Sequence, residues 1–247
     1  MRFLAFFFLM MPIVACPAEA IVAVAANFAP ALEVLRVEFE STSPHQLKIA
    51  SGSTGKLYAQ IVNGAPFDLF LAADTERPRR LEASGNGVPG TRFTYATGRL
   101  AAWSAAPDLV DDDLALTLGQ GRVRRISIAN PALAPYGVAA RQVIDVLGVA
   151  DAVEGRIVMG ENVVQAFTIA VTGNADVGIV ALSTVLTSGA QHGGTFVEIP
   201  ASLHEPIRQD ALLLAHGRSN EAALAFVRFL QSDSARRRLA SFGYGTD

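Results

Sequence analysis

Four short stretches of small and polar residues follow predicted strands and open predicted helices, and the chemistry they offer is hydrogen-bond donation to an anion. They are Ala26-Asn27-Phe28, Ser51 through Gly55, Ala134 through Gly137, and Gly160 through Val163. The first N–H groups of a helix have no partner inside it, and the positive end of the helix dipole lies there. Several converging helix starts therefore predict an anion site that needs no lysine or arginine.

Each polar residue at these junctions also has a plain structural explanation. Asn27, Ser53, Thr54 and Asn162 stand where N-cap residues are expected, and a lone Tyr136 is typical of a partly buried aromatic side chain. Their joint placement favours binding, because the junctions of an open α/β sheet gather at its carboxyl edge. About seven hydrogen bonds to a charged group, at roughly 1.5–3 kcal/mol each, exceed what micromolar-to-nanomolar affinity requires.

Other chemistries fit the sequence less well. The stretch Gly52 through Lys56 resembles part of a nucleotide-binding P-loop, but Ala50 and Leu57 stand where that motif needs Gly and Ser or Thr. No Gly-x-Ser-x-Gly elbow occurs, and the four histidines form no closely spaced metal-binding pair. A transferase that uses Ser53 or Tyr136 stays an alternative, and it requires a base nearby.

Composition limits the partners. The net charge of -3 and a pI of about 5.8 give no basic surface for nucleic acid. Cys16 is the only cysteine, so a disulfide within the chain cannot form and stability must come from burial.

The first residues are typical of an export signal. Arg2 precedes an apolar run from Phe3 to Ala15, and Ala18-Glu19-Ala20 provides a small-x-small cleavage site that would leave Ile21 as the mature start. The run is shorter than the roughly 20 residues that a membrane-crossing helix needs. We therefore expect a periplasmic protein, with lipid attachment at Cys16 as the alternative because Ile13-Val14-Ala15-Cys16 resembles a lipidation box.

Short apolar runs alternate with helical patterns, which predicts an α/β fold with largely parallel sheets. Helices are expected from Pro30 to about Ser41 and over 220–232 and 235–242. No linker separates domains, so ordinary strands must cross any boundary, near 97–99 and 203–207. Strands are expected at 21–25, 46–50, 67–72, 125–129, 156–159 and 177–180.

At the same junctions the chain resembles the periplasmic molybdate-binding proteins of ABC importers, which are type II periplasmic solute-binding proteins. The matching stretches run in order over nearly the whole mature chain. They are Val24 through Phe28, the sequence ASGSTGKLYAQI from Ala50, Gly64 through Asp74, Asn130-Pro131 with Ala134 through Gly137, Gly160 through Val163, and Ala175 through Ala181.

The resemblance implies two lobes, each a mostly parallel sheet flanked by helices, joined by a two-strand hinge. It divides the chain into a signal peptide at 1–20, lobe 1 at 21–98 plus 207–247, and lobe 2 at 99–206. It also implies an anion site between the lobes, formed by Asn27 and Ser53 of lobe 1 with Tyr136 and the Val163 N–H of lobe 2. Further candidates are Ala26, Thr54, Asn162 and Ala181. Some members carry Ser where Asn27 stands and Tyr where Ala181 stands, so Ala181 contributes no side-chain donor.

The expected function is binding of molybdate or tungstate, with no enzymatic step, and delivery to an ABC transporter permease. The resemblance implies no cofactor and no direct bond from protein to metal, and we expect a monomer. Both ions are full dianions at neutral pH and suit a site made of donors alone, whereas phosphate keeps a proton and favours an acceptor carboxylate. The candidate acceptors are Glu161, Asp68, Asp74 and Asp176. The three aspartates are more typical of turn or helix-start residues, and the role of Glu161 stays open. Sulfate, thiosulfate and a role as an anion sensor for a regulator are the alternatives.

Overall fold

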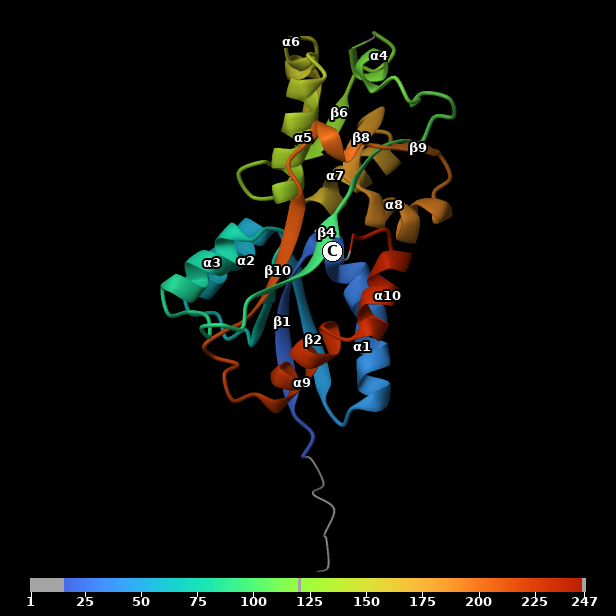
Figure 1. The fold of residues 1–247 in the computed structure, drawn as a ribbon. Helices are drawn as coiled ribbons and strands as arrows, with labels where there is room; N and C mark the ends of the chain where they lie inside the picture. Colours follow the sequence, from blue (N-terminus) through green and yellow to red (C-terminus); the bar gives the residue numbers. More distant parts are fainter. Residues whose placement is uncertain (1–15, 120, 246–247) are drawn as a thin grey trace, which may run out of the picture.

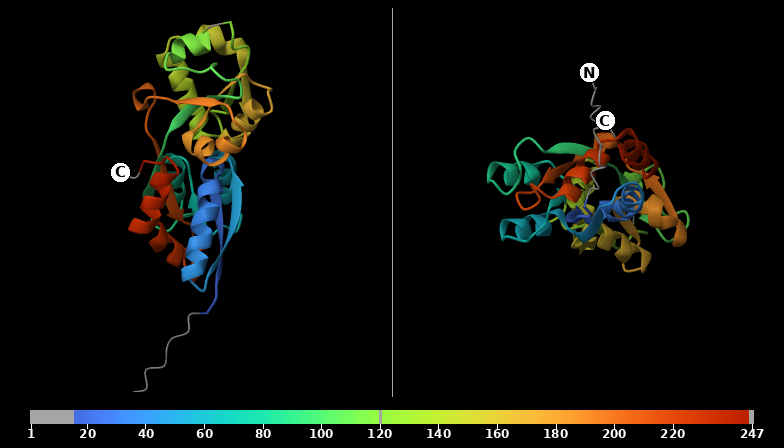
Figure 2. Two further views of the ribbon diagram at one scale, coloured as in Figure 1. Left: turned by 90° about the vertical axis from the view of Figure 1, so that its right-hand side faces the viewer. Right: turned by 90° about the horizontal axis from the view of Figure 1, so that it is seen from below.

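The structure, a computed structural model, describes residues 16–119 and 121–245, so most of the expected export signal lies outside the described residues. The chain forms two lobes, each built on a five-stranded sheet (Figure 1). A view from the side shows the lobes one above the other with a narrow waist between them (Figure 2). This arrangement confirms the predicted two-lobe α/β fold.

The sheet of lobe 1 has the strand order β2-β1-β3-β10-β4. Only β10 runs antiparallel to its neighbours. The strands are β1 (Glu19–Ala25), β2 (Gln46–Gly52), β3 (Leu69–Leu71), β4 (Phe93–Gly98) and β10 (Ile207–Leu213). The helices are η1 (Ala26–Phe28), α1 (Ala29–Thr42), α2 (Thr54–Val62), α3 (Glu76–Ala83), α9 (Glu221–Leu230) and α10 (Asp233–Ser241).

The sheet of lobe 2 repeats this plan with the order β7-β6-β8-β5-β9, and here β5 is the antiparallel strand. The strands are β5 (Leu100–Ser104), β6 (Ile126–Ala129), β7 (Ile157–Gly160), β8 (Val177–Ala181) and β9 (Thr195–Glu198). The helices are α4 (Leu114–Gly119), α5 (Pro135–Val146), α6 (Ala150–Val153), η2 (Glu154–Arg156), α7 (Val163–Val171), α8 (Leu182–Ser188), η3 (Gly189–Gln191) and η4 (Ala201–Leu203).

The chain passes between the lobes twice. It leaves lobe 1 at the end of β4 and enters β5 two residues later, and it returns from β9 through η4 into β10. Figure 1 shows β4 and β10 side by side at the waist, and they pair antiparallel with Ile207 opposite Gly98. The six strands expected from the sequence are all present, whereas β4, β5, β9 and β10 were not predicted.

Each lobe has its own apolar core. In lobe 1, Phe28, Leu32 and Leu35 are fully buried beneath α9, whose Phe226 packs edge-on against Phe39 at 5.2 Å between ring centroids. Leu32, Leu35 and Phe39 are the residues that the 3.6-residue period of the first helix places on one face. In lobe 2 the core is centred on Trp103, Tyr136 and Ile128, among other residues.

Asp68, the one charged residue in the apolar run at 67–72, marks the point where that run is not yet a strand. Its Oδ2 accepts a hydrogen bond from the Ile21 N–H at 2.7 Å, and its Oδ1 lies 3.0 Å from His216 Nδ1. The expected strand is shortened to β3 at its beginning. Asp68, which precedes β3, instead uses its carboxylate to hold the Ile21 N–H of β1. Asp68 is expected from the sequence to have a structural role, and these two contacts agree with that expectation.

The first strand begins before the expected mature start. Glu19 and Ala20 pair with Gln46 and Leu47 of β2, and Ala20 is fully buried. A chain cut after Ala20 thus starts inside β1. Within the described residues, no helix has the length and apolar character needed to cross a membrane.

Candidate functional site

Seven of the eight residues singled out from the sequence line one small cavity between the lobes. The exception is Ala181, which is buried at the end of β8 outside the cavity lining. The lobes are closed on each other so tightly that the cavity admits about one water-sized sphere. Its lining comprises Ala25, Ala26, Asn27, Ser53, Thr54, Ala73, Ala134, Pro135, Tyr136, Asn162 and Val163.

Strand ends position these residues. In lobe 1 the parallel strands β1 and β2 run into η1 and α2, and in lobe 2 the parallel strands β6 and β7 lead to α5 and α7. Parallel neighbours end at the same sheet edge, so each lobe presents two helix starts to the other. The four junctions identified from the sequence therefore meet across the waist.

Ser53 presents a hydroxyl that nothing in the described structure uses. It is the N-cap residue of α2 and only 2% exposed, yet its side chain makes no capping bond and its Oγ has no hydrogen-bond partner. A buried hydroxyl without a partner costs about 1–3 kcal/mol, so its retention at the cavity wall indicates a ligand that satisfies it. The same isolation removes the base that a Ser53 nucleophile would need.

Asn162 and Thr54 support the cavity in another way. Asn162 Oδ1 accepts hydrogen bonds from the N–H groups of Val164 and Gln165 at 3.0 Å each, so its side chain is a plain N-cap of α7. The cap leaves the N–H of Val163, the first residue of α7, without an intrahelical partner. Thr54 Oγ1 accepts a bond from the Ala73 N–H at 3.2 Å and so fixes the start of α2 to the loop after β3.

Tyr136 reaches from lobe 2 into lobe 1. Its hydroxyl accepts hydrogen bonds from Gln209 Nε2 at 3.1 Å and from Asn27 Nδ2 at 3.4 Å, and the described residues accept none from it. The phenolic hydrogen is therefore the donor that Tyr136 has left for an anion. Burial raises the pKa of Tyr136 well above its usual value, which keeps that hydrogen in place and opposes a nucleophilic role.

Asn27 uses its side chain in the same network. Its Nδ2 lies 3.0 Å from Gln209 Oε1 and 3.3 Å from the Tyr244 hydroxyl, in addition to Tyr136. Two amide hydrogens are thus shared among three acceptors. What η1 offers the cavity beyond this is the backbone N–H of its first residues, which have no partner in the helix.

No carboxylate lines the cavity. Glu161, whose role the sequence left open, pairs with Lys56 across the waist at 2.6 Å. Asp74 forms an ion pair with Arg77 and accepts the Arg77 N–H at 3.0 Å, although burial raises the pKa of Asp74. Asp176 accepts the N–H groups of Arg124 and Arg125. With Asp68, all four acids considered as acceptors for a protonated anion are occupied elsewhere.

Direct contacts between the lobes close the cavity. Besides the Lys56–Glu161 pair, the Gly55 N–H donates to the Leu133 carbonyl at 2.9 Å. A Cβ at Gly55 would lie 3.0 Å from that carbonyl oxygen, which is tighter than ordinary contact, so a side chain there would push the lobes slightly apart. The structure is therefore the closed form of a two-lobe protein.

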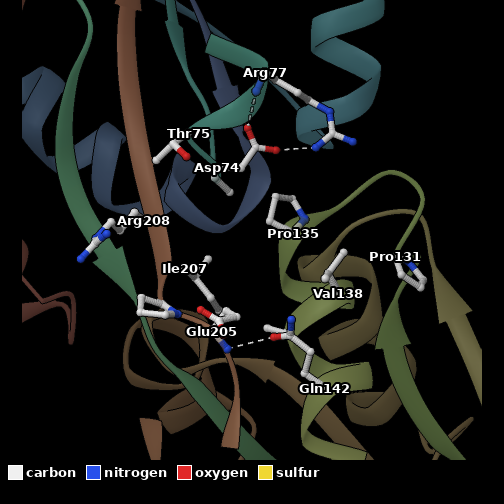
Figure 3. A pocket seen from close by; sticks show the side chains of 13 residues that line it. Asp74, Thr75, Arg77, Pro131, Pro135, Val138, Gln142, Glu205, Ile207 and Arg208 are labelled. Atoms are coloured by element: carbon white, nitrogen blue, oxygen red, sulfur yellow. Dashed lines mark hydrogen bonds and ion pairs between the residues drawn. The ribbon is translucent and has the colours of Figure 1, made fainter. Parts of the chain in front are cut away.

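A larger cavity of about 340 Å³ lies beside the hinge and shares Ala73 and Pro135 with the small one (Figure 3). It is lined from both lobes and by Ile207 and Arg208 of β10. Figure 3 shows Asp74 paired with Arg77 at one end, and Gln142, which accepts the Glu205 N–H at 2.9 Å, at the other. Its charged lining residues are two acids and two arginines, so their charges balance and nothing in the lining selects for an anion.

The sequence reasoning missed Gln209, Tyr95 and Tyr244. Tyr95 hydrogen-bonds Gln209 Oε1 at 3.0 Å, and the Tyr244 hydroxyl donates to the Asn27 carbonyl at 2.9 Å. Burial raises the pKa of Tyr95 well above its usual value and that of Tyr244 to about 12. The available signal was a Gln-Asp pair inside the apolar run of β10, which requires partners once buried.

Comparison with known proteins gives consistent matches. Residues 20–245 match the family model described as bacterial extracellular solute-binding protein. The chain is 45% identical to a molybdate-binding protein of Azotobacter vinelandii, over 94% of this chain and 93% of that protein. It is 41% identical to one of Rhodobacter capsulatus, over 94% and 90%. The solved structure of a periplasmic molybdate-binding protein of Azotobacter vinelandii superposes with a TM-score of 0.86 at 39% identity, covering 92% of this chain and 99% of that one.

Proposed function

The chain belongs to the bacterial extracellular solute-binding proteins, and on this basis we propose that it binds molybdate and tungstate outside the cytoplasm for delivery to an ABC transporter permease. The observation that carries the proposal is the closed cavity with the unpartnered hydroxyl of Ser53 and no charged side chain in its wall. The relatives at 45% and 41% identity, both molybdate-binding proteins, support it.

The cavity chemistry fits a fully ionised tetrahedral anion. Its donors are the Ser53 and Tyr136 hydroxyls, the Val163 N–H and the N–H groups that open η1 and α2. Hydrogen bonds from uncharged donors to an ionised acceptor are roughly twice as strong as neutral ones. Because no carboxylate lines the cavity, phosphate that keeps a proton finds no acceptor carboxylate there.

Binding is reversible and involves no covalent step. The anion bridges donors from both lobes, so its binding energy favours the closed form over the open one. The permease then recognises the closed form, and the protein acts as a monomer. Sulfate and thiosulfate are also anions without a proton to donate and differ from molybdate in size, so they are the second candidate ligands, and sulfate represents them in the test.

The test is calorimetric titration of the purified protein, freed of bound anion, with molybdate, tungstate, sulfate and phosphate at one ionic strength. We expect submicromolar binding of molybdate and tungstate, weak or absent binding of sulfate, and none of phosphate. Binding of sulfate more tightly than molybdate would transfer the proposal to the second candidate. Absence of heat with all four ions would refute an oxyanion function.

A further inference from the structure

Gln209 joins both lobes at the hinge. It lies on β10 beside the crossing from β4 to β5 and is fully buried. Its Oε1 accepts bonds from Asn27 Nδ2 at 3.0 Å and the Tyr95 hydroxyl at 3.0 Å, both of lobe 1. Its Nε2 donates to the Tyr136 hydroxyl of lobe 2 at 3.1 Å. One side chain thus contacts two residues of the anion cavity, one from each lobe.

The residue type matters, because a neutral amide accepts at one end and donates at the other. Two bonds within lobe 1 hold the Gln209 oxygen, so its nitrogen is oriented before the lobes meet. Of the three bonds that Gln209 makes, only the bond to Tyr136 crosses between the lobes. By donating to the Tyr136 hydroxyl oxygen, Gln209 positions that hydroxyl. The phenolic hydrogen of Tyr136 then remains available to donate into the cavity.

Gly98 gives an independent indication that this contact is built for the closed form. A Cβ at Gly98 would lie 2.3 Å from the Tyr136 hydroxyl oxygen and 2.8 Å from Gln209 Nε2. Gly98 ends β4 at the crossing itself and does not have a left-handed backbone, so the requirement for glycine there is one of space. The Tyr136 ring tip and the hinge strand therefore meet only because position 98 has no side chain.

We propose that Gln209 is a positioning residue that couples closure of the lobes to anion binding, by holding Asn27 and the incoming Tyr136 hydroxyl in one buried network at Gly98. The inference rests on the proposed oxyanion function. In the open form Gln209 keeps its lobe 1 partners, and on closure Tyr136 completes the network and turns its remaining hydrogen to the anion. The hydrogen-bond network at the hinge strand is therefore complete only when lobe 2 is in the closed position.

The first test is the pH profile of Gln209→Glu. A protonated carboxyl has one O–H donor and can replace Nε2 towards Tyr136, whereas a carboxylate cannot donate and adds a negative charge near the anion. Burial raises the pKa of such a group. The titratable groups facing position 209 are Tyr95 and Tyr136, and burial keeps both protonated. Asp210 lies next along β10 and pairs with Arg92.

We therefore expect the variant to bind molybdate within about threefold of wild type at pH 6 and at least tenfold more weakly at pH 9, while wild type stays flat. A flat profile for the variant would overturn the proposal, since it would show that loss of the donor at position 209 does not affect anion binding. Tungstate, titrated in parallel, checks that the profile belongs to the protein and not to one ion.

A double-mutant cycle tests the partner. Gln209→Leu and Tyr136→Phe should each weaken molybdate binding, and the double variant should lose less than the sum of the two single losses, because both remove the same link between the lobes. Gln142→Leu is the matched control, a glutamine at the rim of the neighbouring cavity, and it should leave affinity unchanged. Additive losses at 209 and 136 would contradict the coupling.

A third variant separates closure from binding. Gly98→Ala should fold with a normal circular dichroism spectrum yet resist closure, seen as a persistently larger radius of gyration in solution scattering with saturating molybdate, and as at least tenfold weaker affinity. Closure like that of wild type would overturn the proposal. If wild-type protein itself ignores all four anions, the proposed function fails, and the coupling that rests on it fails with it; if wild type binds and Gly98→Ala closes normally, only the coupling fails.

Discussion

Replacing Ser53 by alanine should lower affinity for the anion without destabilising the free protein. In the ligand-free structure the Ser53 hydroxyl makes no hydrogen bond, so its removal breaks none. It also relieves a buried unpartnered oxygen, which offsets the lost packing of that atom, and the net change in unfolding free energy is about zero or slightly positive.

With the anion bound, the same hydroxyl donates to a charged acceptor. Such a bond contributes about 1.5–3 kcal/mol, and since 1.4 kcal/mol corresponds to a tenfold change, the dissociation constant should rise about 10- to 100-fold. Calorimetric titration with molybdate measures this effect, and thermal unfolding without anion measures stability. We therefore expect Ser53→Ala to raise the dissociation constant for molybdate while leaving the unfolding temperature of the free protein nearly unchanged.

Ser127→Ala in lobe 2 is the matched control. Ser127 is fully buried, its hydroxyl donates to the Ala166 carbonyl at 2.8 Å, and neither residue lines the cavity. Its loss should cost about 1 kcal/mol of stability and leave affinity unchanged. The reasoning on Ser53 is refuted if Ser53→Ala binds within twofold of wild type, or if it is destabilised as much as the control.

Three further outcomes follow from the site. Asn27→Asp removes the donor to Gln209 Oε1 at 3.0 Å and sets a negative charge beside the dianion, so titration should show at least a 100-fold loss, and undiminished affinity would remove Asn27 from the site. Lys56→Met breaks the partly exposed pair with Glu161, worth about 0.2–1 kcal/mol, so affinity should fall at most about fivefold, and less at 1 M salt; a larger loss would show that Lys56 faces the anion. The folded-state pKa of Tyr244, about 12, lies above the usual 10. Its contribution to stability is therefore complete below pH 10 and is lost as pH rises towards 12, so the unfolding temperature should fall over that range. In a Tyr58→Phe background, which removes the partly exposed tyrosine outside the network, the phenolate absorbance change should accompany unfolding, and phenolate formation before unfolding would contradict the buried network.

The sequence by itself determined the fold class and the place of the site. Alternating short apolar runs and amphipathic helices are local patterns, and they placed the six parallel strands and the first and last helices within one or two residues at most ends. A helix start that faces a ligand requires small residues at the strand-to-helix junction. This requirement also depends only on the local sequence. For that reason, seven of the eight residues chosen at those junctions line one cavity.

The tertiary structure alone decided what each polar residue does. Asn162 and Ser53 are alike as N-cap residues in the sequence, yet one caps its helix and the other leaves its hydroxyl to the cavity. That difference depends on which donors surround each side chain after folding. Gln209 lies 182 residues from Asn27 and on a strand whose polar residues hid it from a search for apolar runs. Its role arises from non-local contacts at the hinge, and no local period or spacing encodes them.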